Sequence, residues 1–207
     1  MGESVQKKAH IWERDPDNWY VEPTWVSKRL FEVEKFHGRV VDPCAGMGNI
    51  VAGAAEAGVR VVGYDLRDRG YPSINGGVNF FDTDQLPGRW PVENIASNPP
   101  YGARTPSDEQ ERRRLEEEFL RVALQRSTRK VALFLPSAWL NGKQRGEWLE
   151  SLPLYRVYFV APRPSCPPGT MIQSGQTPGQ GTADYAWYVF LHGFDGDPTL
   201  HFLRRDG

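Results

Sequence analysis

A glycine-rich turn between an apolar strand and a helix constrains the fold of this chain more than any other feature. The β-branched run in "RVVDPCAGMGN" ends at Gly46-Met47-Gly48, and "IVAGAAEAG" then has the pattern of a helix that ends at Gly58. Glycines allow a tight turn and a close approach of the backbone to a ligand. A second strand, "VRVVGYDL", follows directly. This order predicts an open α/β sheet with a ligand site beyond the carboxyl ends of its strands.

Strands and helices alternate along much of the remaining chain. The pattern predicts a single Rossmann-like α/β domain with a mostly parallel, twisted, seven-stranded sheet, helices on both faces and an antiparallel last strand. Residues 163–182 are rich in Pro, Gly, Gln and Ser and predict a long loop, and the strands that it joins are expected to be antiparallel to each other. Further strands are expected at 76–82, 93–97, 129–136, 155–162 and 183–193, and helices at 23–36, 108–126 and 142–152.

Composition excludes several classes of protein. The 207 residues have a net charge of −1, so the overall basic charge of many nucleic-acid binders is missing. Two cysteines make no disulfide framework, and the four scattered histidines have no metal-ligand spacing. The first residues contain no apolar signal segment, and no apolar run has the length of a membrane span. We therefore expect a cytoplasmic protein without a metal and without membrane association.

The acidic residues around the glycine turn indicate which nucleotide would bind. Asp65 ends the second strand 19 residues after Gly46, where a carboxylate can accept hydrogen bonds from a ribose. A dinucleotide fingerprint needs a third glycine where this chain has Val51, and the P-loop lysine motif is absent. Asp42, directly before the turn, would repel a pyrophosphate but suits a ligand with an ammonium or sulfonium group. S-adenosylmethionine carries both cations and a ribose, so it is the predicted cofactor.

The stretch "IASNPPYGA" is the second informative feature. An apolar strand stops at Asn98, and Pro99, Pro100 and Tyr101 follow. Prolines fix φ and remove backbone donors, so neither a helix nor a strand can continue through them. The pattern predicts a stiff loop at a strand end that holds an amide and a phenol in place, which is where chemistry tends to sit.

From about Tyr20 to about Gly193, the chain resembles the class I S-adenosylmethionine-dependent methyltransferases. It is most similar to amino-methylating DNA methyltransferases of phage type, which act on adenine N6. "DPCAGMGNI" matches their cofactor loop, "NPPY" their catalytic tetrapeptide, and "WYVEPTWVSKRLFE" their N-terminal cofactor motif. Met47 departs from the small or polar residue more usual at its position. The resemblance implies an N-terminal extension over 1–19, a methyltransferase domain over 20–197 and a C-terminal tail over 198–207.

The resemblance also implies roles for residues. Asn98 and the backbone carbonyl of Pro99 would accept the two hydrogens of an exocyclic amine, Pro100 would keep the loop rigid, and Tyr101 would stack on a flipped-out base. Phe80 would lie on the cofactor adenine, and either Asn79 or Asp82 would contact its amino group. The cofactor-binding residues expected together are Tyr20, Glu22, Pro23, Asp42, Pro43, Ala45, Gly46, Gly48, Asp65, Leu66, Asn79, Phe80 and Asp82.

Several alternatives remain open in the sequence. Methyltransferases of release-factor glutamines and of ribosomal RNA guanines share the tetrapeptide, and a catalytically silent scaffold could keep the fold. Adenine N6 and cytosine N4 are not separated, nor is a target sequence defined. The resemblance implies DNA as the partner. Because only 198–207 follow the expected domain, recognition would use loops, a separate target-recognition partner or a homodimer.

Overall fold

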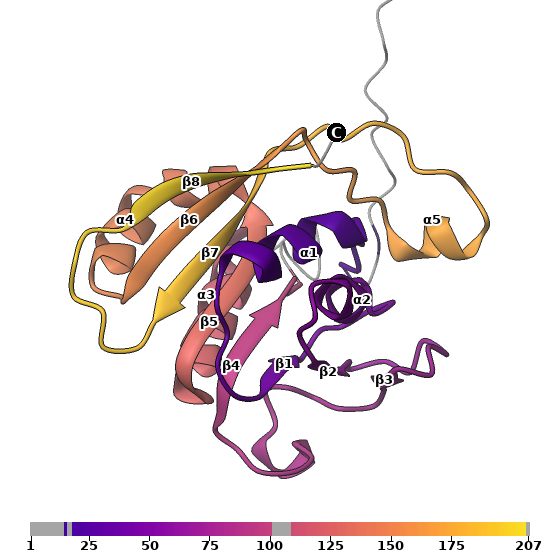
Figure 1. The fold of residues 1–207 in the computed structure, drawn as a ribbon, viewed down its shortest axis with the longest axis horizontal. Helices are drawn as coiled ribbons and strands as arrows, with labels where there is room; N and C mark the ends of the chain where they lie inside the picture. Colours follow the sequence, from indigo (N-terminus) through magenta and orange to yellow (C-terminus); the bar gives the residue numbers. More distant parts are fainter. Residues whose placement is uncertain (1–14, 16–17, 101–108, 206–207) are drawn as a thin grey trace, which may run out of the picture.

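A mixed sheet of eight strands forms the centre of the fold, in the order β3-β2-β1-β4-β5-β7-β6-β8 (Figure 1). The structure, a computed structural model, describes residues 15, 18–100 and 109–205, with only the backbone for 109–114. The strands are β1 (Val40–Asp42), β2 (Val61–Tyr64), β3 (Ile74–Asn75), β4 (Val92–Ser97), β5 (Ser127–Pro136), β6 (Leu154–Ala161), β7 (Tyr185–Leu191) and β8 (Thr199–Arg204). The helices are α1 (Thr24–Val33), α2 (Asn49–Glu56), η1 (Thr83–Gln85), α3 (Glu109–Gln125), η2 (Ser137–Asn141), α4 (Lys143–Glu150) and α5 (Gly169–Gln173).

Strand direction places the ends of the central strands at one edge. Strands β3, β2, β1, β4 and β5 pair in parallel, while β7 is antiparallel to both β5 and β6. The chain leaves β1 toward β2 and β3 on one side and returns to β4 and β5 on the other. Ligands in open α/β sheets bind at such a switch point, beyond the carboxyl ends of the strands. The predicted α/β class is confirmed, as is the antiparallel pairing of β6 with β7.

Alternation along β5 shows how the sheet separates two cores. Val131, Leu133 and Leu135 belong to a cluster with α3 and α4, while Ala132 and Phe134 belong to a cluster with α1 and α2. All five side chains are fully buried. Successive side chains of a strand point to opposite faces, so helices cover this strand on both sides. No helix in the described parts of the chain is long and apolar enough to cross a membrane.

Two expected elements are placed differently in the structure. The third strand is the two-residue β3, not 76–82, because Phe80 turns into the core, where its ring centroid lies 4.9 Å from that of Phe119 of α3. Phe80 and Phe81 lie in a turn and pack against α3, but in the sequence two adjacent aromatic residues look the same as part of a buried strand. The loop expected over 163–182 contains the short helix α5, whose polar sequence gave no apolar repeat.

The sheet has eight strands where seven were expected, because β8 lies in the segment expected to be a C-terminal tail, 198–207. Strand β8 pairs in parallel with β6 at the sheet edge, while the strand that was expected to be last, β7, is antiparallel to both of its neighbours, as predicted. Only Leu203 of this strand is buried. An edge strand with one buried side chain lacks the alternation that identifies a strand in a sequence. The expected extension 1–19 likewise includes Trp19, which is buried.

A buried ion-pair network fixes the end of α1 to the sheet. Glu34, 1% exposed, accepts hydrogen bonds from Lys130 of β5 and from Arg156 and Tyr158 of β6. Burial alone would raise the pKa of Glu34, but these hydrogen bonds lower it below its usual value. The network thus ties α1 to two strands that are distant in sequence.

We predict that Glu34→Gln lowers the free energy of unfolding by about 3 kcal/mol at pH 7, because two cations lose their carboxylate. Since the folded pKa is the lower one, the stabilisation exists above the unfolded value of 4.5 and fades as pH falls through the folded value. The difference between variant and wild type in urea unfolding should therefore shrink below pH 4.5. Glu32→Gln is the control. It removes only partly exposed pairs with Lys28 and Arg29 and should cost at most about 1 kcal/mol. Equal losses at both positions would contradict the prediction.

Candidate active site

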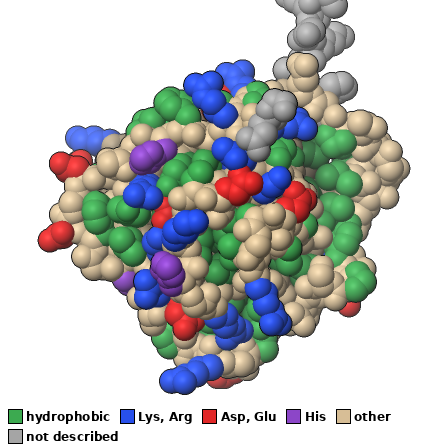
Figure 2. Space-filling view, viewed as in Figure 1, with side chains coloured by type: hydrophobic (Ala, Val, Ile, Leu, Met, Phe, Trp, Pro, Cys, Tyr) green, Lys and Arg blue, Asp and Glu red, His purple; other side chains and the backbone are tan. Residues whose placement is uncertain are grey.

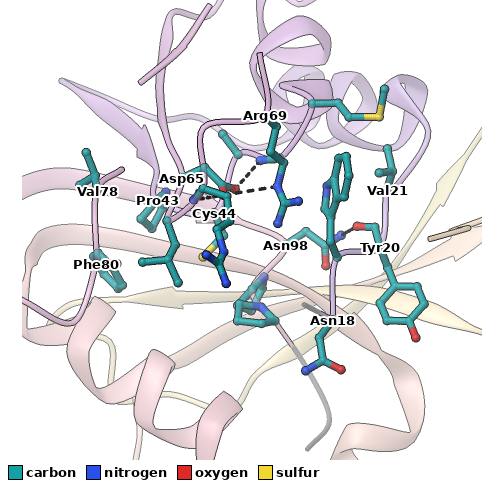
Figure 3. Close-up of a pocket in the computed structure, with 18 of the residues that line it drawn as sticks. Asn18, Tyr20, Val21, Pro43, Cys44, Asp65, Arg69, Val78, Phe80 and Asn98 are labelled. Atoms are coloured by element: carbon teal, nitrogen blue, oxygen red, sulfur yellow. Dashed lines mark hydrogen bonds and ion pairs between the residues drawn. The ribbon is translucent and has the colours of Figure 1, made fainter. Parts of the chain in front are cut away.

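A cavity of about 750 Å³ lies where β1, β2 and β4 end (Figure 3). Its walls come from the segment before α1, the turn after β1, the loop after β2 and the residues after β4. In Figure 3, Asn98 and Tyr20 lie at one end, Val78 and Phe80 at the other, and Asp65 between them. A cavity of this size is in the range of small-molecule and cofactor sites.

The turn after β1 is held by a buried carboxyl group. Asp42 Oδ1 accepts hydrogen bonds from Ser97 Oγ at 2.7 Å and from the Cys44 amide at 3.1 Å. Asp42 Oδ2 is buried and has no partner within the described residues. Burial raises the pKa of Asp42 well above its usual value, although the two hydrogen bonds oppose this shift. The turn ends at Gly48, whose φ of +86° favours glycine at the start of α2.

Asp65 links the loop after β2 to the same turn. Its Oδ2 accepts a hydrogen bond from the Gly46 amide at 2.8 Å, and its Oδ1 accepts one from the Arg67 amide at 2.9 Å. Arg69 Nε lies 3.5 Å from Oδ1. A carboxylate oxygen can accept two hydrogen bonds, so these contacts orient Asp65 and leave it further acceptor capacity.

The amide of Asn98 is oriented by the segment before α1. Its Nδ2 donates to the Tyr20 carbonyl at 3.0 Å and to Glu22 Oε2 at 2.7 Å. Its Oδ1 is buried and accepts no hydrogen bond from any residue that the structure describes. An unpaired buried carbonyl is costly and points to a donor that the described chain does not supply.

Glu22 is a carboxyl group of the cavity wall with a strongly raised pKa. Its side chain is buried, and burial raises the pKa to about 7 despite the opposing hydrogen bond from Asn98. Glu22 also interacts electrostatically with Asp42, whose pKa it helps to raise. Together with Asp65, these carboxyl groups make the surroundings of the cavity favourable for a cation.

The far end of the cavity is apolar. Phe80 is 3% exposed and also contacts the core, while Leu66 is 56% exposed and lines the cavity. Asn79 also lines the cavity, and its Oδ1 accepts a hydrogen bond from the Phe81 amide. Asp82 instead caps η1 through the Asp84 amide and does not reach the cavity. Of the two candidates that the sequence left open here, only Asn79 is at the site.

Trp19 forms a wall that the sequence did not identify. Its ring packs against Gly169, where an added Cβ would lie 2.2 to 2.4 Å from three ring atoms. The Arg69 guanidinium lies over the Trp19 ring, 3.9 Å from its centroid. The backbones of Trp19 and Val21 exchange hydrogen bonds with Gly169 and Pro167. The connection between β6 and β7 therefore supports the cavity through the N-terminal segment.

Most of the expected site residues line the cavity, and the rest divide into two groups. Pro23, Asp42, Gly48 and Asp82 lie outside its lining, and Tyr101 is outside the described residues. The expected residues that line it are Tyr20, Glu22, Pro43, Ala45, Gly46, Asp65, Leu66, Asn79, Phe80, Asn98, Pro99 and Pro100. The lining residues that were not expected are Asn18, Trp19, Val21, Cys44, Met47, Asn49, Arg67, Arg69, Val78, Phe81, Leu115 and Glu118.

Comparison with known proteins gives the fold of the chain. No protein-family model and no curated protein matches the sequence. A Listeria monocytogenes protein assigned to the class I S-adenosylmethionine-dependent methyltransferases matches 86% of this chain and 62% of its own, with 15% identity and a TM-score of 0.53. The chain has the class I methyltransferase fold.

Two further solved structures are similar to this chain in fold. The M protein of the type I restriction enzyme EcoKI matches 91% of this chain at 14% identity, with a TM-score of 0.54. DrdV, solved as a complex with DNA, matches 92% at 13% identity, with a TM-score of 0.55. The match covers 49% of the EcoKI M protein and 28% of DrdV, so this chain spans less than two thirds of all three proteins.

We predict that Gly169→Ala lowers the free energy of unfolding by about 1–3 kcal/mol, because the new methyl group would displace the Trp19 ring. Gly146→Ala is the matched control. Gly146 lies in α4 with open space around its Cβ position, so alanine should stabilise the protein by up to about 1 kcal/mol. Urea unfolding measures both effects. A Gly169→Ala variant as stable as the wild type would mean that Trp19 is not held as described.

Proposed function

We propose that this protein transfers the methyl group of S-adenosylmethionine to an exocyclic amine of a nucleic-acid base, with adenine N6 in DNA as the first candidate. The observation that carries the proposal is the buried Oδ1 of Asn98 after β4, which has no hydrogen-bond partner among the residues that the structure describes. An acceptor held by a rigid Pro99-Pro100 loop suits a substrate that brings an N–H group. The class I methyltransferase fold supports the same conclusion.

The residues around the cavity fit S-adenosylmethionine in chemistry. Glu22 and Asp65 line a cavity whose apolar end, with Leu66 and Phe80, suits a purine. Burial raises the pKa of Glu22, and a cationic ligand beside this carboxyl group would stabilise its ionised form. The bound cofactor would supply a methyl group activated by a sulfonium. Asp65 would hold the ribose, the turn at Gly46 the methionine part, and Asn79 and Phe80 the adenine.

The chain's own residues would then act on the amine. The lone pair of an exocyclic amine is delocalised into its ring, which makes the nitrogen a poor nucleophile. Asn98 Oδ1 and the Pro99 carbonyl would accept its two hydrogens and favour tetrahedral geometry at nitrogen. Their rigid placement contributes through positioning, which can be worth roughly 7–11 kcal/mol. Tyr101 would stack on the base.

The choice of nucleic acid as substrate rests on the site and on the neighbours in fold. DrdV is a complex with DNA, and the EcoKI M protein belongs to a restriction enzyme, which favours DNA here. Figure 2 shows basic side chains spread over the face with α1 and β8, with acidic and hydrophobic side chains between them. Charge on this face thus makes no separate case for DNA. We further propose that a partner chain or a second copy helps in target recognition.

The direct test is methyl transfer from radiolabelled S-adenosylmethionine to DNA, tRNA, ribosomal RNA and a release factor. Nucleoside mass spectrometry of the labelled substrate should identify N6-methyladenine in DNA. Label in glutamine or in RNA guanine would move the assignment to another substrate of the same chemistry. Cofactor binding without transfer to any of them would contradict the proposal and favour a scaffold.

We predict that Asn98→Ala lowers kcat by at least about 100-fold, because the lost acceptor acts mainly in the transition state. The dissociation constant of the cofactor should change by less than about threefold, as measured by calorimetry. Near-wild-type turnover of this variant would contradict the role given to Asn98.

We predict that Asp65→Asn weakens cofactor binding at least about tenfold, because a hydrogen bond to a charged group contributes roughly 1.5–3 kcal/mol. Asp82→Asn is the matched control, since Asp82 caps η1 outside the cavity and should leave the affinity within about twofold. Calorimetry measures both. Equal effects at the two positions would show that the cofactor is not held from the end of β2.

A further inference from the structure

Two acceptors fix which end of the Asn98 amide is exposed to a ligand. An amide group has a donor end and an acceptor end, and its neighbours decide how it is turned. The Tyr20 carbonyl and Glu22 Oε2 both accept hydrogen bonds from Asn98 Nδ2. Turning the amide over would place Oδ1 against two other oxygen atoms. The acceptor end is therefore left for a substrate.

Glu22 itself is held from three sides. Its backbone carbonyl accepts a hydrogen bond from Asn49 Nδ2 of α2 at 2.6 Å. The preceding amide, of Val21, donates to the Pro167 carbonyl, and Tyr20 forms a bridge with Pro168. The carboxyl group is thus placed against Asn98 by contacts from α2 and from the connection between β6 and β7. Such a placement is expected for a group that orients another side chain.

We infer that Glu22 is a positioning residue, whose ionised carboxylate presents Asn98 Oδ1 to the substrate amine and whose protonation weakens this presentation. The inference rests on the proposed function and adds a regulatory device to the same site. An ionised carboxylate only accepts hydrogen bonds, so it can bind the Nδ2 end of the Asn98 amide but not the Oδ1 end. A protonated carboxyl can donate to Oδ1, which would engage the acceptor that the substrate needs.

The surroundings of Glu22 place this protonation in the neutral range. The titratable groups that interact with it are Asp42 at the end of β1 and Cys166 of the connection between β6 and β7. The arginines of the same cavity wall are Arg67 and Arg69, and Arg69 pairs with Asp65. Burial raises the pKa of Glu22 to about 7. Because the ionised form is the productive one, activity should rise as pH increases through this value.

The kinetic test compares kcat/KM for the cofactor from pH 6 to pH 8, because this ratio reports the ionisation of the free enzyme. Wild-type kcat/KM should rise about tenfold, as expected for one group with a pKa of about 7. In Glu22→Gln, which can still accept from Nδ2 but does not titrate, this rise should fall to less than about twofold. Glu22→Leu should lose at least about 30-fold in kcat at pH 8. The control Glu32→Gln, at a partly exposed position of α1, should keep the wild-type profile.

The outcomes separate this role from others. An unchanged pH profile in Glu22→Gln would overturn the inference. So would a Glu22→Leu variant that loses only cofactor affinity, since Glu22 would then be a cofactor ligand. Folding of each variant is checked by circular dichroism.

A second readout does not depend on turnover. The side-chain ¹⁵N resonance of Asn98, assigned by its loss in Asn98→Ala, should titrate near pH 7 in the wild type and stay constant in Glu22→Gln. A resonance that does not respond to pH would overturn the inference even if the protein methylates DNA. Conversely, a titrating amide in a protein that binds cofactor but methylates nothing would mean that the proposed function fails while the coupling of Glu22 to Asn98 stands.

Discussion

Parallel pairing of β1 with β4 is the constraint on which the site depends. The register sets Val40 against Asn94 and Val41 against Ile95, so both strands end at the same height. The hydrogen bond from Ser97 Oγ to Asp42 Oδ1 joins their last residues. The glycine turn and the Asn98 loop therefore begin side by side, although more than fifty residues separate them in sequence. The proposed cofactor site and the proposed amine site can share one cavity only because of this pairing.

The electrostatics of the site work against stability and in favour of a ligand. Glu22 and Asp42 are buried without a cation paired to them in the described structure, and burial raises the pKa of both. A protein designed only for stability would place apolar side chains there. The Glu34 network at the opposite end of β5 shows the contrasting case, because there each carboxylate oxygen meets a cation. The carboxylate of Glu34 is neutralised by its cations, whereas Glu22 and Asp42 are not paired with a cation in the described structure. A positively charged molecule is therefore expected beside Glu22 and Asp42.

The sequence predicts what is encoded locally and misses what depends on distant contacts. The turn at Gly46 and the loop at Asn98 were identifiable because glycine and proline act on their own backbone. Trp19 was missed because its partner, Gly169, is 150 residues away and nothing local marks either residue. The sequence could not decide between Asn79 and Asp82, because both follow an apolar residue. The structure separates them, since Asp82 caps η1 and Asn79 lines the cavity. Strand β8 was missed because its single buried side chain, Leu203, gives no period.

The central claim is that Asn98 Oδ1 and the Pro99 carbonyl receive the amine of a nucleic-acid base. A crystal structure with S-adenosylhomocysteine and an oligonucleotide that carries an unpaired adenine tests it most directly. The account predicts adenine N6 within hydrogen-bond distance of both oxygens, with the cofactor sulfur facing the same nitrogen. An adenine bound elsewhere, or a cofactor outside the cavity between Asp65 and Asn98, would contradict it.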